Sequence, residues 1–241
     1  TKKAEGHEPL FHIVKRPAIA WWHAWLIRIG AVIAALLVAG IVTLALTGEN
    51  PISVYGTMIK SSFGTNRRVW QLLQNIAMLL CVALAVTPAF RMRFWNIGAE
   101  GQVLIGGLAT AACMITLSGK VPDGVLILIM AVAAIVAGAI WGVIPAFFKA
   151  NWGTNETLFT LMMNYVAMQL VQFFVVKWEV PKGSGKVGII NQDTHAGWLP
   201  TIGDNSYLLN IIIVALIVVI LFVYLRYSKH GYEISVVGES E

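Results

Sequence analysis

Long apolar runs alternate with short polar connections along most of the chain. An apolar run of about 18 residues or more with few charges is long enough to cross a bilayer as a helix. Such runs predict membrane-spanning helices at about 23–47, 70–90, 98–117, 125–148, 157–176 and 208–225. A shorter stretch at about 52–63 predicts an interfacial helix. The predicted fold class is all-α: a polytopic membrane protein with about six transmembrane helices.

The two ends of the chain differ from this apolar region. Residues 1–22 are polar and basic and end in two tryptophans, as expected for a segment at a membrane surface. We therefore predict a cytoplasmic or interfacial segment at 1–22, a transmembrane domain at 23–226 and the start of a cytoplasmic loop at 227–241. Because the sequence begins with Thr1 and not with methionine, we expect a piece of a longer polypeptide.

The charge distribution gives only a small preference for one orientation. Alternating spans with a cytoplasmic N-terminus put residues 2, 3, 15, 16, 28, 91, 93, 149, 226 and 229 inside, which are ten of the 17 Lys and Arg. The other seven lie outside. Positive residues favour the cytoplasmic side of membrane proteins, so the count agrees weakly with this orientation.

The composition excludes an ordinary soluble domain. Hydrophobic residues make up 58% of the chain and charged residues only 12%, against about a quarter charged in soluble domains. The net charge of +5 is explained by Lys and Arg that contact anionic headgroups, so we expect membrane lipids and no nucleic acid as partners. Cys81 and Cys113 fall inside apolar runs and imply no disulfide.

A polar, glycine-bearing break at 91–102 separates the second and third apolar runs. Polar groups cost free energy in hydrocarbon and are tolerated where they face a bundle interior or a water-filled cavity. Asn96 can cap the helix that begins here and leave its first N–H groups free for a polar ligand. Two interpretations stay open: part of a translocation path, or a capped helix start on a tight cytoplasmic turn.

Two of the predicted spans carry a polar stripe at helical spacing. The members on the second span are Gln71, Gln74 and Asn75, and those on the fifth are Thr157, Thr160, Asn164, Met168 and Gln172. Such stripes can face a solute path. They can equally supply ordinary hydrogen bonds between helices.

The residues that would carry catalysis or bind a metal or cofactor are missing from the pattern. Gly183-Ser184-Gly185-Lys186 lacks the upstream glycine of a phosphate-binding loop. The five histidines have no ligand spacing, and no nucleophile with its base can be argued. We therefore expect no enzyme activity, no catalytic residue, no metal and no cofactor, and any ATP hydrolysis must belong to a separate subunit.

Three stretches in order resemble bacterial ABC importer permeases of the nucleoside and simple-sugar class, also known as branched-chain amino acid/ribose-type permeases. They are the break at 91–102 with its continuation to Ala111, then 149–165, and then 231–239. The resemblance implies a permease subunit in the bacterial inner membrane that belongs to a larger helix bundle. It also implies three partners: an ABC ATPase subunit, a second permease subunit that is homologous or identical, and an extracytoplasmic substrate-binding protein.

The resemblance and the polar stripe on the second span together indicate which residues act. A substrate path would involve Gln74, Asn75, Trp95, Asn96, Gly98, Glu100, Gln102, Asn155, Glu156, Phe159 and Asn164. Coupling to the ATPase would involve Gly231, Tyr232, Glu233 and Gly238 in the segment after the last span. Trp95 and Phe159 flank polar signature residues and either line one cavity, where they would stack on a nucleobase, or pack against neighbouring helices. The sequence departs from the family pattern at Trp95 and at 157–159, which leaves the solute open.

Three functions are compatible with these patterns. The first is an ABC importer permease for nucleosides or related small polar solutes, with a simple-sugar permease as its variant. The second is a secondary carrier or channel, in which broken helices beside polar residues are also common. The third is a membrane scaffold whose polar stripes face partner proteins.

Overall fold

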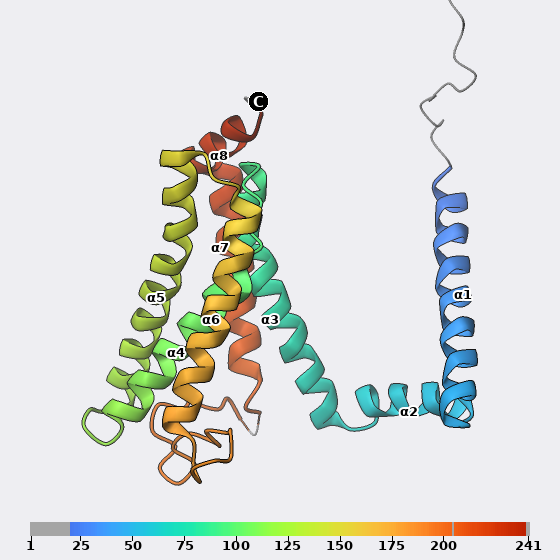
Figure 1. Ribbon diagram of the computed structural model, residues 1–241, viewed down its shortest axis with the longest axis horizontal. Coiled ribbons are helices and arrows are strands. Elements are labelled where there is room, and N and C mark those ends of the chain that lie inside the picture. Colours follow the sequence, from blue (N-terminus) through green and yellow to red (C-terminus); the bar gives the residue numbers. More distant parts are fainter. Residues whose placement is uncertain (1–19, 204, 240–241) are drawn as a thin grey trace, which may run out of the picture. The chain divides into compact units, whose positions relative to one another are not determined.

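The computed structural model describes residues 20–203 and 205–239, which form eight helices (Figure 1). They are α1 (Trp21–Thr47), α2 (Pro51–Phe63), α3 (Asn66–Arg91), α4 (Ala99–Leu117), α5 (Asp123–Trp152), α6 (Glu156–Trp178), α7 (Leu208–Tyr227) and α8 (Lys229–Glu239). Within the described ranges the β-structure is limited to an isolated bridge between Ile202 and Asn205. The all-α prediction is therefore confirmed.

Six of these helices, α1 and α3 to α7, are long and apolar enough to cross a membrane. They coincide with the six apolar runs in the sequence, and α2 lies where the interfacial helix was expected. Pro145 lies inside α5, which continues to Trp152. A proline removes one backbone hydrogen bond, and in a membrane helix neighbouring groups can compensate for that loss. The expected N-terminal segment at 1–22 lies almost entirely outside the described residues.

The chain divides after Thr65 into two compact units. In the first unit, Gly48 ends α1 in the left-handed conformation, with φ 71°. The side chain of Asn50 then caps α2 by accepting a 3.0 Å hydrogen bond from the N–H of Ile52. α2 also bonds back to α1, because the Tyr55 hydroxyl donates to the carbonyl of Leu36 at 2.6 Å.

In the second unit, α4 packs against both α5 and α6. Small residues allow the close approach: a Cβ added to Gly106 would lie 3.3 Å from the backbone oxygen of Ala134 in α5. A Cβ on Gly142 would lie 2.7 Å from the side-chain nitrogen of Gln102 in α4. Helices in lipid associate through such close van der Waals contacts, so these two glycines serve helix packing.

The remaining helices form a second packed group, in which α3 lies against α7 and α8 lies against both. The segment expected to begin a loop at 227–241 is helical from Lys229 to Glu239. Two features permit this helix: the Ser228 hydroxyl oxygen accepts a 3.0 Å hydrogen bond from the Gly231 N–H, and Gly238 lies directly against the carbonyl of Arg91. A side chain at position 238 would overlap that carbonyl.

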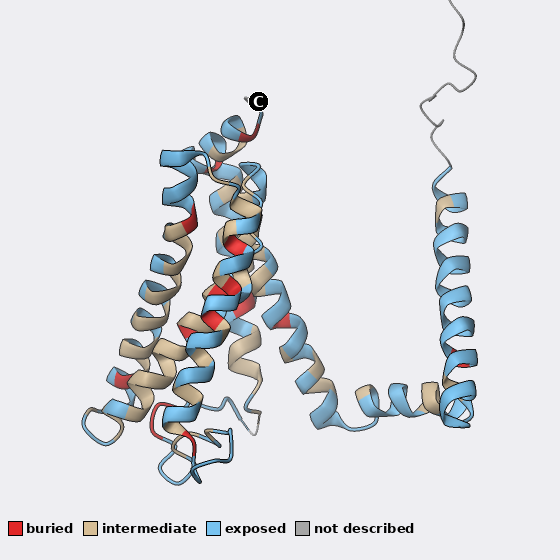
Figure 2. Ribbon diagram, viewed as in Figure 1, coloured by how far each residue is buried: buried red, intermediate tan, exposed pale blue. Residues whose placement is uncertain are grey.

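Few side chains in the described part of the chain are buried (Figure 2). In the second unit, one group of them lies on α6 where it packs against α4, and this group includes polar Thr160 and Asn164. The outward faces of the long helices are apolar and exposed. Apolar exposed faces suit helices surrounded by lipid or by further helices, in agreement with a multi-pass membrane protein.

Candidate functional site

The connection between α3 and α4 forms a compact loop at residues 92–98. The side-chain oxygen of Asn96 accepts a 2.8 Å hydrogen bond from the N–H of Gly98, which is a local turn of the Asx type. The N-cap of α4 is Gly98, with no side-chain cap bond. The expectation that Asn96 caps this helix is therefore wrong: the helix begins two residues later, and Asn96 turns the chain toward it.

Three residues of α6 bind this loop in a row. Glu156, Thr160 and Asn164 are spaced four apart and so share one face of the helix. The hydroxyl oxygen of Thr160 accepts a 3.2 Å hydrogen bond from the N–H of Ile97. The amide of Asn164 donates to the carbonyl of Ile97 at 3.0 Å and accepts from the N–H of Gly101 at 2.9 Å. The polar stripe on α6 thus holds the loop and the first turn of α4.

The Asn164 bond also changes what was expected of the helix start. The backbone N–H groups there were expected to be free for a ligand, whereas the N–H of Gly101 is bonded within the protein. Buried polar groups require such partners, because an unpaired one costs about 1–3 kcal/mol. For this amide the partner is a side chain of α6.

The glycines at the start of α4 are required by this contact. A Cβ on Gly101 would lie 2.8 Å from the side-chain oxygen of Asn164 and 3.1 Å from the indole nitrogen of Trp141. A Cβ on Gly98 would lie 3.1 Å from the Cβ of Thr160. Alanine at either position would therefore push α4 and the loop away from α6.

An ion pair joins the end of α5 to the start of α6. The ammonium of Lys149 lies 2.8 Å from a carboxylate oxygen of Glu156. The backbone N–H of Trp95 faces the same carboxylate, so Glu156 is also part of the attachment of the loop. Beside it, the side chain of Asn155 caps α6 by accepting a 3.1 Å hydrogen bond from the N–H of Leu158.

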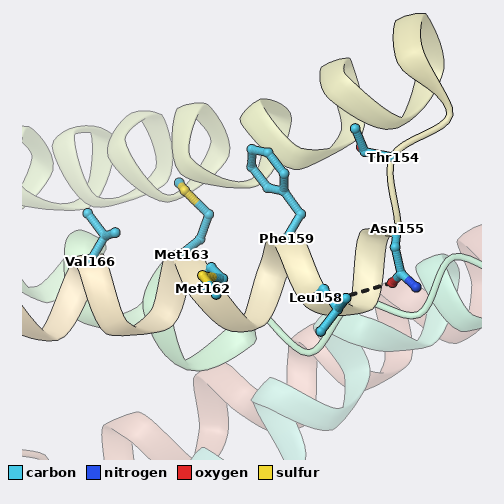
Figure 3. A pocket seen from close by; sticks show the side chains of 7 residues that line it. All are labelled: Thr154, Asn155, Leu158, Phe159, Met162, Met163 and Val166. Carbon is cyan, nitrogen blue, oxygen red and sulfur yellow. Dashed lines mark hydrogen bonds between the residues drawn. The ribbon is translucent and has the colours of Figure 1, made fainter.

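A largely apolar pocket of about 430 Å³ lies beside this α5–α6 connection (Figure 3). It is lined by Thr154, Asn155, Leu158, Phe159, Met162, Met163 and Val166. The Phe159 ring points toward α5 and stacks on Phe148, with ring centroids 4.9 Å apart. The hydroxyl of Thr154 is buried without a hydrogen-bond partner among the described residues. The pocket therefore presents an aromatic and apolar wall with little polar surface.

A family profile described as "Branched-chain amino acid transport system / permease component" matches residues 68–241. The chain belongs to that family. The match includes the loop, the α5–α6 connection and α8, which are the three stretches whose sequence resembles ABC importer permeases.

Curated relatives agree with this family. The glucose ABC transporter permease protein TsgB13 of Haloferax volcanii is 29% identical over 94% of this chain and 61% of its own length. The guanosine ABC transporter permease protein NupP of Bacillus subtilis is 31% identical over 84% and 58%, respectively. The nucleoside ABC transporter permease protein NupB of Lactococcus lactis is 27% identical over 88% and 60%. The chain thus spans about three fifths of these relatives. No solved structure matches it.

The residues that were predicted to line the substrate path do not all lie together in the structure. Trp95 is 62% exposed and is not among the residues that line the Phe159 pocket; its ring is tilted against that of Phe90, 5.6 Å away. Gln74 is half-buried and Asn75 is exposed on α3. Asn75 lies 16 residues before the end of α3, about 24 Å along the helix axis, and so is remote from the loop.

Two further expected residues lie on the first turn of α4. Glu100 is exposed, and no hydrogen bond or ion pair is found for its carboxylate within the described residues. Gln102 is half-buried against Gly142 of α5. Glu100 is thus accessible to a solute or partner, whereas Gln102 contributes to the contact between helices.

The residues expected to couple to an ATPase divide into two groups on α8. Gly231 and Gly238 are buried on the side that packs against α7 and α3. Tyr232 is 72% exposed, and Glu233 forms a 3.9 Å ion pair with Lys229 on the surface. The glycines therefore seat the helix, and Tyr232 is presented outward.

The long connection between α6 and α7 is ordered by a carboxylate. Glu179 accepts 2.8 Å hydrogen bonds from the N–H groups of both Gly183 and Gly185, which hold the pKa of this carboxyl below its usual value. Farther along, the side chain of Asn191 donates to the carbonyls of Met114 and Ala196. The bond to Met114 attaches the connection to the end of α4.

The search for site residues by sequence missed Lys149, Thr154 and Trp141. Lys149 could have been found, because Glu156, seven residues later, carries the opposite charge and lies on the other side of the same short turn. Thr154 lies in the second resembling stretch but carries no sign that its hydroxyl is buried. Trp141 lies in an apolar run. Its indole nitrogen is buried beside Gly101 and has no hydrogen-bond partner among the described residues, which only helix packing could reveal.

Proposed function

We propose that this chain is the permease subunit of an ATP-driven importer for nucleosides or related small polar solutes. The observation that carries the proposal is the family match over residues 68–241. Two relatives are described as guanosine and nucleoside ABC transporter permeases. The packing of the loop at 92–98 onto α6 supports it further, because two of the resembling stretches meet there.

In this proposal, the residues of the site have different tasks along the substrate path. One group shapes the path, because its polar groups or close contacts hold the loop and the helices around the loop. This group consists of Asn96, Gly98, Gln102, Glu156 and Asn164. Asn155 shapes the path at the start of α6, where its side chain caps the helix. Solutes would be contacted by groups that remain accessible, Trp95 and Glu100 beside the loop and Asn75 with Gln74 on α3.

The pocket beside α6 would contribute apolar contact with the solute. Phe159 offers an aromatic surface, and base stacking on an aromatic ring is worth about 1–3 kcal/mol in nucleic-acid binders. A mainly apolar wall with few polar groups is typical of small-molecule pockets.

The proposed complex contains three further components. An ABC ATPase subunit supplies the energy, a second permease subunit, identical or homologous, completes the membrane part, and an extracytoplasmic substrate-binding protein delivers the solute. The N-terminus lies in the cytoplasm and the complex in the bacterial inner membrane. This orientation puts α8 on the ATPase side, where Tyr232 and Glu233 contact the ATPase while Gly231 and Gly238 seat the helix.

A simple sugar is the second candidate solute, because the relative from Haloferax volcanii is described as a glucose permease. The Trp95→Leu variant separates the two candidates. If Trp95 stacks on a nucleobase, uptake of guanosine should fall more than uptake of ribose or glucose. Equal losses for both solutes would assign Trp95 to packing and remove this support for a nucleoside.

The proposed function is tested by reconstituting the full-length protein with its ATPase and binding protein in vesicles. Uptake of labelled guanosine should require ATP on the cytoplasmic side and persist when an ionophore dissipates the proton and ion gradients. Uptake that needs a gradient and ignores ATP would instead identify a secondary carrier. Absence of uptake for every nucleoside and sugar, with an intact complex, would favour the scaffold function.

A further inference from the structure

A groove between α3 and α7 combines two arginines with an apolar floor. It has a volume of about 440 Å³ and is lined by Leu84, Thr87, Arg91, Val218, Leu221, Phe222, Leu225 and Arg226. The groove lies outside the contact between α4 and α6 described above. No carboxylate is among these lining residues.

The charged end of the groove is well defined. α3 ends at Arg91 and α7 ends at Tyr227, one residue after Arg226. These two ends adjoin, since Arg91 and Arg226 line the same groove. Both arginines are exposed, and neither guanidinium has a hydrogen bond or ion pair within the part of the chain that the structure describes. The positive charges of Arg91 and Arg226 therefore lie at the neighbouring ends of α3 and α7, with no opposite charge paired to them among the described residues.

The apolar part of the groove extends from this end toward the middle of the spanning helices. Leu84 lies seven residues before Arg91, and Val218 lies eight residues before Arg226. At 1.5 Å per residue, the apolar lining continues for about 10–12 Å, or two helical turns, from the arginines. The hydroxyl of Thr87 is turned to its own helix, where it donates to the carbonyl of Ala83 at 2.8 Å.

We infer that this groove binds an anionic phospholipid, with the phosphate between Arg91 and Arg226 and one acyl chain along Leu84, Val218 and Leu221. Guanidinium groups bind phosphate oxygens through two parallel hydrogen bonds. Basic pockets between membrane helices bind anionic headgroups. The occupant is a lipid and not a soluble phosphate, because the arginines continue directly into an apolar groove along two helices long and apolar enough to span a membrane.

The inferred lipid would also contact the base of α8. Gly238 lies against the backbone of Arg91, and Ser228, which caps Gly231, follows Arg226 by two residues. An anionic lipid that fixes both arginines would therefore stabilise the seat of α8. This inference does not depend on which solute the protein carries.

Native mass spectrometry of the delipidated, assembled complex tests the inference. Phosphatidylglycerol and phosphatidylcholine with identical acyl chains are added back in parallel, with glycerol 3-phosphate as the soluble headgroup. We expect retention of phosphatidylglycerol above phosphatidylcholine and no retention of glycerol 3-phosphate. Near-surface basic residues predict about a fivefold loss of affinity for phosphatidylglycerol in Arg91→Gln or Arg226→Gln and about a 30-fold loss in the double variant.

Matched variants assign the effect to the groove. Lys229→Gln removes a positive charge at the same helix end but outside the groove, and should keep the preference for phosphatidylglycerol. Val218→Phe should fill the apolar part and reduce retention while both arginines remain, whereas Val219→Phe, next to it but outside the groove, should not. If the double arginine variant fails to assemble, the comparison of phosphatidylglycerol retention between Val218→Phe and Val219→Phe still shows whether the lipid lies in the groove.

Three results would overturn the inference. Equal retention of the two phospholipids would exclude a site for anionic headgroups. Retention of glycerol 3-phosphate as strong as that of the lipid would identify a soluble-phosphate site. A preference for phosphatidylglycerol that survives both the double arginine variant and Val218→Phe would place the lipid elsewhere.

Discussion

Asn164 and Gly101, 63 residues apart in the sequence, are joined by a buried 2.9 Å hydrogen bond from the backbone N–H of the glycine to the side-chain oxygen of the asparagine. The other end of the same amide donates to the carbonyl of Ile97. One side chain of α6 therefore fixes both the loop at 92–98 and the first turn of α4. This contact makes the position of the loop sensitive to the size of residue 101.

Gly101→Ala should destabilise the protein. The added Cβ would lie 2.8 Å from the Asn164 oxygen, and overpacking of this kind costs about 1–3 kcal/mol. The measurement is thermal unfolding of the purified protein in detergent. Gly107→Ala in the same helix is the control, because no atom lies within 4 Å of a Cβ at that position. That control should be neutral or slightly stabilising, and equal shifts for the two variants would contradict the packing described here.

Glu100→Gln should reduce solute uptake without reducing the amount of protein in the membrane. The carboxylate is exposed in the first turn of α4, so its loss removes a charge beside the loop and leaves the apolar spans intact. Uptake and protein level are measured in the same cells. Asp123→Asn, in the first turn of α5 at the opposite end of the bundle, is the matched control. Normal uptake in Glu100→Gln would remove this residue from the proposed path.

Tyr232→Ala should weaken the coupling of solute to ATP hydrolysis while the thermal stability stays unchanged. The side chain is 72% exposed on α8, so its removal affects a partner surface and not the packing within this chain. Solute-stimulated ATP hydrolysis of the assembled complex is the measurement. Tyr227→Ala, at an equally exposed tyrosine just before α8, is the control. Deletion of 231–238 should abolish the stimulation, and hydrolysis that remained coupled would place the docking surface elsewhere.

The connection between α6 and α7 should loosen at acidic pH. Because the folded-state pKa of Glu179 is lowered by the N–H groups of Gly183 and Gly185, ionisation of this carboxyl stabilises the folded connection above the ordinary glutamate pKa of about 4.3. That stability is lost as the pH falls through the lowered pKa. Limited proteolysis between 179 and 207 should therefore increase as the pH falls below about 4.

A variant shows whether Glu179 causes this pH dependence. Glu179→Gln should be cleaved faster than the wild type at pH 7 and should show little further change on acidification. Glu49→Gln, an exposed glutamate in the other compact unit, should behave like the wild type. Identical pH profiles for the wild type and Glu179→Gln would contradict the role of the two backbone hydrogen bonds.

The apolar pattern of the sequence was enough to predict the six long helices. Six runs of suitable length predict six spanning helices, since a bilayer leaves the backbone few alternatives to a helix. The short helix α2 and the family also followed from sequence, the latter from three ordered stretches. The polar stripe on α6 was visible too, because residues four apart share a helix face.

What each polar residue does was decided by the tertiary structure. Spacing alone could not tell whether Thr160 and Asn164 face a cavity or another segment; the packing of α4 against α6 places them beneath the loop. Spacing also suggested Asn96 as the cap of α4, whereas the loop geometry gives that place to Gly98. Likewise, the sequence placed 229–239 in the connection after the last span without giving its conformation; in the structure it is a helix whose glycines pack on α7 and α3. Local pattern determines helices, but the partner of a hydrogen bond between distant residues exists only once the helices have packed.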